Sequence, residues 1–283
     1  MTNYGSTNAA PNPAASTISI ATTTTASAIS IASTTTPLSG GEKPSFRRHM
    51  TTCVTKRHGD LVLLICYIIT GLLDSFATAV WGSFVSMQTG NTVYVGLGIV
   101  DPGASTRWIK SASSIASFCV GSFWFSRLHR VFTPTKRWVL VFSFTVQLSM
   151  IVAAALIVLL APPVKPGELH WQVLVPLSLV AFQSSGQAVA SRALEYSGLT
   201  SVVLTSSYCD LFSDRNLFAG LGSNVERNRR TAAPILLLTG VVIGGFWSRT
   251  PFGIAAALWT AAALKFGIVV AWFFWRTDSR SNG

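Results

Sequence analysis

Acidic residues are scarce in this sequence: only 10 of its 283 residues are Asp or Glu, and charged residues of both signs make up 11%. Soluble domains carry about 25% charged residues, so the scarcity excludes an ordinary soluble domain as the main body of the chain. Hydrophobic residues make up 49% instead. Several apolar stretches approach or exceed the ~20 residues that a helix needs to cross a bilayer. The composition therefore predicts an integral membrane protein.

Cysteine and histidine are also few. The four cysteines are scattered, and three of them lie in or beside apolar segments, where a thiol packs as a small hydrophobe. The four histidines lack the spacing of metal ligands. The sequence contains no phosphate-binding loop, nucleophile elbow or dinucleotide fingerprint. We therefore expect no disulfide framework, no metal site, no cofactor and no enzymatic activity.

Basic residues outnumber acidic ones, with 21 Lys and Arg, but they lie between apolar segments and form no single stripe. No aromatic and basic binding module accompanies them, so nucleic-acid binding is not expected. In a membrane protein such loop charges indicate orientation and contact with anionic headgroups. The lipid bilayer is the predicted partner.

The chain divides by composition into a tail, a membrane domain and a short end. Residues 1 to about 45 are rich in Ser, Thr and Ala and cannot bury enough apolar surface to offset the entropy of ordering. A basic run follows up to Arg57. We predict a disordered cytoplasmic tail over 1–57 with a basic end beside the membrane, a membrane domain over 58–277, and a C-terminal tail over 278–283.

The membrane domain is predicted to be an all-α, polytopic transmembrane helical bundle of about six spans. The ordinary apolar segments lie at about 61–82, 111–125, 138–161, 171–190, 232–247 and 251–275. Two shorter segments, 84–100 and 200–212, are interrupted by polar residues and are predicted to be re-entrant or broken.

The positions of the basic clusters favour six crossings over eight. If neither short segment crosses fully, every basic cluster and both termini lie in the cytoplasm; eight crossings would place the 127–137 cluster outside. Eight remains an alternative, because a helix of about 17 residues can span a thin bilayer. We expect a multi-pass protein, with the plasma membrane favoured over internal membranes.

The two halves, about 58–161 and 171–276, follow the same plan of one span, one short polar piece and two spans. The polar triplets at 89–91 and 205–207 are offset by about 116 residues. Three crossings per half would make the second half run in the opposite sense, as in many secondary transporters. The alternative is a chance alignment of numerous apolar segments.

Ionisable residues inside the apolar segments are the first candidates for a pathway. Asp74 lies within the first span and Lys265 near the middle of the last. A charged group there is costly unless it is paired, protonated or hydrated. Asp74 is interpreted either as part of a proton or cation relay or as a structural bond between helices. Asp74 and Asp210 are the carboxylates predicted to pair with Lys265.

Polar residues of the two short segments are further candidates, because bare backbone must face protein or water within a membrane. In the first segment they are Gln88, Thr89, Gly90 and Asn91, and in the second Thr205 begins the corresponding triplet.

The span at 171–190 contains Gln183 and Gln187, which are four residues apart and share a helix face. Small residues beside them permit close helix contact, and amides hydrogen-bond across such contacts. Packing is therefore one interpretation of these glutamines, and lining a pathway is the other.

The string GLLD at 71–74, followed by Phe84 and by MQTGNT at 87–92, is similar to the signature of the YoaK-like family, a domain-of-unknown-function group of integral membrane proteins. The resemblance covers about residues 58–277, and the Ser/Thr-rich tail resembles that of the fungal branch. The second half departs from the pattern, because TSS at 205–207 stands where Thr-Gly is usual. The resemblance implies a fold and no particular substrate.

Two functions fit these observations. The first is a small secondary transporter or exporter of an unidentified small solute, or of protons, in which the Thr-Gly-Asn turn at 89–91, Asp74 and Lys265 border a central site. The second is a non-transporting scaffold or regulatory subunit, in which the same residues only hold helices together.

Overall fold

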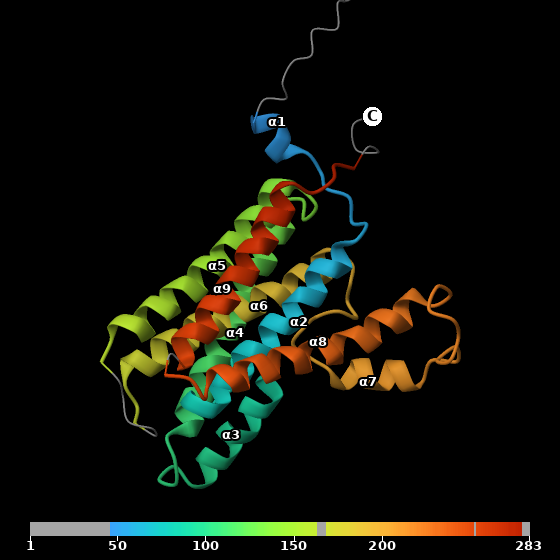
Figure 1. The fold of residues 1–283 in the computed structure, drawn as a ribbon. Coiled ribbons are helices and arrows are strands. Elements are labelled where there is room, and N and C mark those ends of the chain that lie inside the picture. The colour runs from blue at the N-terminus through green and yellow to red at the C-terminus, as the bar shows by residue number, and fades with distance from the viewer. Residues whose placement is uncertain (1–45, 163–167, 252, 279–283) are drawn as a thin grey trace, which may run out of the picture. The chain divides into compact units, whose positions relative to one another are not determined.

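The computed structural model describes residues 46–162, 168–251 and 253–278, which contain helices and two isolated β-bridges but no strand (Figure 1). The chain divides into residues 1–42 and 43–283, and only the second unit falls within the described ranges. The helices are α1 (Phe46–Thr51), α2 (Gly59–Phe76), the π-helix η1 (Ala77–Trp81), α3 (Gln88–Val100), α4 (Arg107–Val131), α5 (Arg137–Leu160), α6 (Trp171–Ala193), α7 (Thr205–Phe212), α8 (Val225–Trp247) and α9 (Gly253–Phe273).

Within the described residues, five helical segments are long and apolar enough to cross a membrane, namely α2 with η1, α5, α6, α8 and α9. The helix α4 has 25 residues but is more polar, with serines along its length and basic residues at both ends. The predicted all-α helical membrane bundle is confirmed, and the chain is an integral membrane protein.

The first residue of α5 ties the end of α9 to the segment that precedes α2. The Arg137 guanidinium donates to the carbonyl of Trp275 at 2.6 Å and to that of His49 at 2.9 Å. The Val54 N–H donates to the carbonyl of Thr135 at 2.8 Å. These bonds attach part of the segment 46–57, which belongs to the tail predicted for 1–57, to the bundle. The part of that tail before residue 46 lies outside the described residues.

Ion pairs bring the starts of α2 and α8 to the same end as the finish of α6. The Arg229 guanidinium lies 2.9 Å from the Asp60 carboxylate, and the Lys56 amine lies 2.5 Å from the carboxylate of Glu195. We call this the basic end of the bundle, marked by Lys56, Arg137 and Arg229. Here α2, α5 and α8 begin, and α4, α6 and α9 finish.

The long helices therefore alternate in direction, and the two short ones join helices at opposite ends. The helix α3 follows η1 and precedes α4, far from the basic end, whereas α7 lies between the finish of α6 and the start of α8. Figure 1 shows α3 and α7 at different places along the bundle. This arrangement matches the predicted plan of six long segments and two short ones.

Glycines allow two pairs of helices to approach closely. A Cβ at Gly240 of α8 would collide with the carbonyl oxygen of Ile68 in α2, and one at Gly121 of α4 would collide with the backbone of Phe182 in α6. Each pair runs parallel, and small residues at such crossings are typical of membrane helices.

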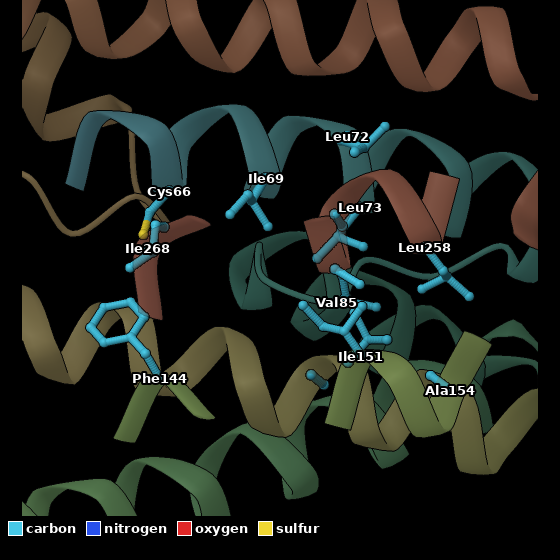
Figure 2. Packing of buried hydrophobic residues seen from close by; sticks show 14 of the residues in the cluster. Cys66, Ile69, Leu72, Leu73, Val85, Phe144, Ile151, Ala154, Leu258 and Ile268 are labelled. Carbon is cyan, nitrogen blue, oxygen red and sulfur yellow. The ribbon is translucent and has the colours of Figure 1, made fainter. Parts of the chain in front are cut away.

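The apolar core lies among α2, α5, α6 and α9. Figure 2 shows Ile69 and Leu72 of α2 with Phe144 and Ile151 of α5 and Ile268 of α9. These side chains are almost completely buried. The core surrounds a small set of polar groups, which form the candidate site.

Candidate functional site

Lys265 is completely buried in α9 and its amine bonds to two glutamine side chains. It donates to the side-chain oxygen of Gln147 in α5 at 2.9 Å and to that of Gln187 in α6. It also lies 5.4 Å from the centre of the Phe144 ring, which favours a cation. The amine is thus held by neutral groups from two neighbouring helices.

The predicted ion pair of Lys265 with Asp74 or Asp210 is wrong. Asp210 is exposed on α7, and the Asp74 carboxylate is occupied by other donors. The sequence indicated correctly that Lys265 needs partners inside the bundle, but amide oxygens supply them. Gln147 was missed, although a lone amide in the middle of an apolar span was an available signal.

Gln187 extends this set of bonds toward α2. Its side-chain NH₂ donates to the hydroxyl of Thr70 at 3.1 Å and to that of Ser201, before α7, at 3.2 Å. All these polar residues are buried. We call Thr70, Gln147, Gln187, Ser201 and Lys265 the Lys265 network. It joins α2, α5, α6 and α9.

Gln183, the other predicted glutamine of α6, lies outside the Lys265 network. Its NH₂ donates to the hydroxyl of Ser184 at 3.1 Å, and its buried oxygen accepts no hydrogen bond from the described residues. Packing is tight nearby, because a Cβ at Gly186 would lie 2.8 Å from the Gln147 amide nitrogen and from the Phe125 ring. The surface of α6 thus combines close packing with buried amides. Both interpretations of its glutamines, helix packing and the lining of a pathway, are compatible with this arrangement.

Asp74 organises the break between the first span and α3. Its carboxylate accepts hydrogen bonds from the N–H of Val85 at 2.8 Å, from the N–H of Ser86 at 3.0 Å and from the Ser86 hydroxyl. Charge-assisted bonds of this kind are stronger than neutral ones. They satisfy backbone donors that the irregular segment 82–87 would otherwise leave unpaired inside the protein.

The triplet 89–91 forms the first turn of α3 and is not an isolated polar turn. Only Asn91 is buried, and its side-chain oxygen accepts from the Ser83 hydroxyl at 2.9 Å and the Phe84 N–H at 3.0 Å. Its NH₂ donates to the Phe84 carbonyl at 2.8 Å and the Gln88 side-chain oxygen at 2.8 Å. Asn91 therefore fastens α3 to the loop that Asp74 holds.

The neighbours of Asn91 have lesser roles. The Gln88 NH₂ donates to the Val85 carbonyl at 3.1 Å. Thr89 is exposed, and a Cβ at Gly90 would lie 2.7 Å from the Phe84 ring. The Thr-Gly pair therefore fits a close helix–loop contact, and we infer no ligand contact from it.

The corresponding triplet 205–207 likewise begins a helix, α7. Thr205 is exposed and Ser207 is buried. The structure brings neither Thr205 nor Asp210 to the Lys265 network. Of the predicted residues, it brings Lys265 and Gln187 together in the Lys265 network. It places Asp74, Gln88 and Asn91 around the segment 82–87, to which all three bond.

The sequence profile of a family described as protein of unknown function (DUF1275) matches residues 62–271. The chain belongs to this family. The match covers α2 to α9 and agrees with the YoaK-like resemblance of the sequence. Searches of the curated proteins and of the solved structures each found no match.

Proposed function

We propose that this protein is a small secondary transporter or exporter, and that the Lys265 network forms part of its solute pathway. The observation that carries the proposal is the complete burial of the Lys265 amine among neutral oxygens of two spanning helices. A buried ionisable group in a membrane segment is costly, and such groups mark substrate and ion pathways. The solute is a small molecule or a proton.

The arrangement of helix pairs supports an inverted internal repeat. If α2, α4 and α5 correspond to α6, α8 and α9, the parallel pair of α2 with α8 corresponds to that of α6 with α4. The antiparallel pair of α5 with α9 then corresponds to itself. A two-fold axis in the membrane plane would relate pairs in this manner.

The Lys265 network fits the same axis. Its two bonds between the proposed halves join Lys265 to Gln147 and Gln187 to Thr70, and the partners are 118 and 117 residues apart. Both separations are close to the repeat offset of about 116 expected from the sequence. Inverted-repeat transporters bind their solutes at such an interface, which supports a central site here.

The broken element after α2 supplies a second feature of transporters. The π-helix η1 and the segment 82–87 interrupt the first span, and Asp74 and Asn91 hold that interruption closed. Broken helices are typical of transporter sites, and π-helical turns are frequent at functional sites. We propose that this segment moves when the pathway opens on the side away from the basic end.

The basic residues indicate how the bundle is oriented in the membrane. The basic end carries the positive residues that favour the cytoplasmic side, and both ends of the described chain lie there. We propose a multi-pass plasma-membrane protein with both termini in the cytoplasm.

Native Cys66 provides a test that needs no knowledge of the solute. Cys66 is completely buried in α2, one helical turn before Thr70 of the Lys265 network. In a variant with the other three cysteines changed to Ser, a charged, membrane-impermeant thiol reagent would be added to sealed vesicles from each side. A transporter exposes its central site to each side in turn, so slow labelling of Cys66 from both sides is expected.

The matched control is Ala154→Cys with Cys66→Ser, because Ala154 is equally buried in the apolar core but lies two helical turns beyond Gln147 in α5. It should remain unlabelled. Labelling of Cys66 from only one side would indicate a one-sided crevice and contradict alternating access. Silence from both sides would favour the scaffold or regulatory subunit.

A further inference from the structure

A pocket of about 290 Å³ opens at the basic end, where α4 and α6 finish side by side. It belongs neither to the Lys265 network nor to the Asp74 loop. Its charged or titratable lining residues are His129, Arg130 and Arg192. The rest of the lining is Ser126, Pro134, Val189 and Ala193. The pocket is therefore basic, and it lies at the ends of two long helices.

His129 is the buried polar group of this pocket. His129 is only 6% exposed, and neither nitrogen of its ring has a hydrogen-bond partner among the described residues. Buried polar groups almost always have a partner in the protein, in water or in a ligand. A histidine ring that lines a pocket and lacks a protein partner indicates that something else bonds to it.

The two arginines indicate that the missing partner carries a negative charge. Arg130 and Arg192 are exposed, and no acidic residue lines the pocket with them. The nearest acid after α6 in the chain, Glu195, is paired with Lys56 instead. Arginine presents a planar fork of N–H donors that matches the oxygens of a phosphate. Two such forks and a histidine donor around one pocket fit a phosphate group.

The orientation proposed above, with the basic end on the cytoplasmic side, gives the source of that group. Basic pockets between transmembrane helices on the cytoplasmic side bind the headgroups of anionic lipids. The pocket also has ample room, since a single water needs only about 10–15 Å³.

We propose that the pocket between the ends of α4 and α6 binds a phosphate group, supplied by the headgroup of an anionic lipid. Arg130 and Arg192 bind the phosphate oxygens from two sides, and the His129 ring donates a further hydrogen bond from beneath. The bound headgroup bridges α4 and α6 at the end where Gly121 no longer holds them in contact. The proposal does not depend on whether the protein transports a solute.

The test uses the full chain, purified in a non-ionic detergent and stripped of lipid. The probes are dihexanoyl phosphatidic acid, a short-chain lipid with a phosphate headgroup, and inorganic phosphate, each titrated by calorimetry. Arg130→Gln, Arg192→Gln and His129→Phe remove one pocket donor each. The control is Arg127→Gln, which removes a charge from the same end of α4, where Arg127 lies over the Phe123 ring outside the pocket.

Phosphatidic acid should bind the wild-type protein and the Arg127→Gln variant equally, and each arginine variant of the pocket about tenfold more weakly. The exposed arginines can be changed without loss of fold, which an unchanged melting temperature would verify. Equal binding by pocket and control variants, or binding by none of them, would overturn the proposal and leave water as the partner of His129. Arginine-dependent binding of inorganic phosphate that is as tight as that of the lipid would keep the phosphate site but contradict the lipid as its source.

Discussion

The amine of Lys265 and the side-chain oxygen of Gln147 lie 2.9 Å apart, although the two residues are 118 positions apart in the sequence. They belong to α9 and α5, which pack antiparallel through the centre of the bundle. The bond is therefore a long-range contact deep inside the protein, and its energy can be measured.

A double-mutant cycle should reveal that energy. Lys265→Met leaves the oxygens of Gln147 and Gln187 without their donor, which should lower the free energy of unfolding by about 1–3 kcal/mol. Adding Gln147→Leu should cost less than the sum of the single changes, with a coupling of about 0.5–3 kcal/mol. The measurement is unfolding in mixed detergent micelles.

Thr260→Val is the control for this cycle, because the Thr260 hydroxyl bonds only within α9, to the Ala256 carbonyl at 2.8 Å. It should be additive with Gln147→Leu. If the effects of Lys265→Met and Gln147→Leu were also additive, the bond between the two side chains would contribute nothing to stability.

The crossing of α2 and α8 predicts an effect of a single methyl group. Gly240→Ala would push a Cβ into the backbone of Ile68, so the helices must separate, at a cost of about 1–3 kcal/mol in the free energy of unfolding. Gly245→Ala is the matched control on the same helix, since no atom lies within 4 Å of the new Cβ. It should be neutral or stabilising by up to about 1 kcal/mol, and an equal loss in both variants would contradict the close contact.

Asp74→Ala should release the segment 82–87. The N–H groups of Val85 and Ser86 lose their acceptor, and each buried donor left unpaired costs about 1–3 kcal/mol. Hydrogen exchange followed by mass spectrometry should therefore quicken in the peptide covering 82–87. In the control Ser75→Ala, which removes only a bond to the Leu72 carbonyl within α2, exchange there should stay slow; fast exchange in both variants would point to general loosening of α2.

His129 predicts a dependence of stability on pH. It lies beyond the predicted span 111–125, and burial lowers its pKa from 6.5 to about 4. The unfolded chain therefore binds more protons than the folded protein between pH 6.5 and 4, so stability is retained above pH 6.5 and falls as the pH drops through this window. The slope is about 1.4 kcal/mol per pH unit.

The charged groups that line the pocket with His129 are Arg130 on α4 and Arg192 on α6. Unfolding should be followed from pH 7.5 to 5 in phosphate-free buffer after removal of lipid. His129→Gln should flatten the slope by about one proton, and an unchanged slope would assign the pH dependence to other groups.

Cysteine labelling predicts opposite sides for the two short helices. Thr92 of α3 and Asp210 of α7 are both exposed. The helix α3 connects two helices at the end away from the basic end, whereas α7 connects α6 and α8 at the basic end. In a background without native cysteines, Thr92→Cys should react with an impermeant reagent on intact cells, and Asp210→Cys only after permeabilisation. Reaction of both on intact cells would contradict the proposed six-crossing topology.

The sequence predicted the long apolar helices well because their signal is local. The predicted span 138–161 nearly coincides with α5, and 171–190 with α6, since a run of apolar residues bounded by polar loops needs no knowledge of neighbours. The helix α4 extends beyond the predicted 111–125 at both ends, because its polar first and last turns carry no apolar signal.

The partners of buried polar groups could not be predicted from the same information. A carboxylate is the usual partner of a buried lysine, and Asp74 was available, but the distance between two helices is not encoded by spacing along the chain. Asp74 is used by the backbone of Val85 and Ser86, and that use depends on the path of an irregular loop.

The close parallel crossings of α2 with α8 and of α4 with α6 have a consequence for synthesis in the cell. Each crossing unites a helix of the first half with a helix of the second half, so α2 and α4 enter the membrane before their partners have been translated. A ribosome that stops after α5 would leave Gly71 of α2, which packs on Leu237 of α8, and Gly121 of α4 open to lipid. The two halves, translated as separate chains in one cell, should find each other in the bilayer and restore the bundle that neither can complete by itself.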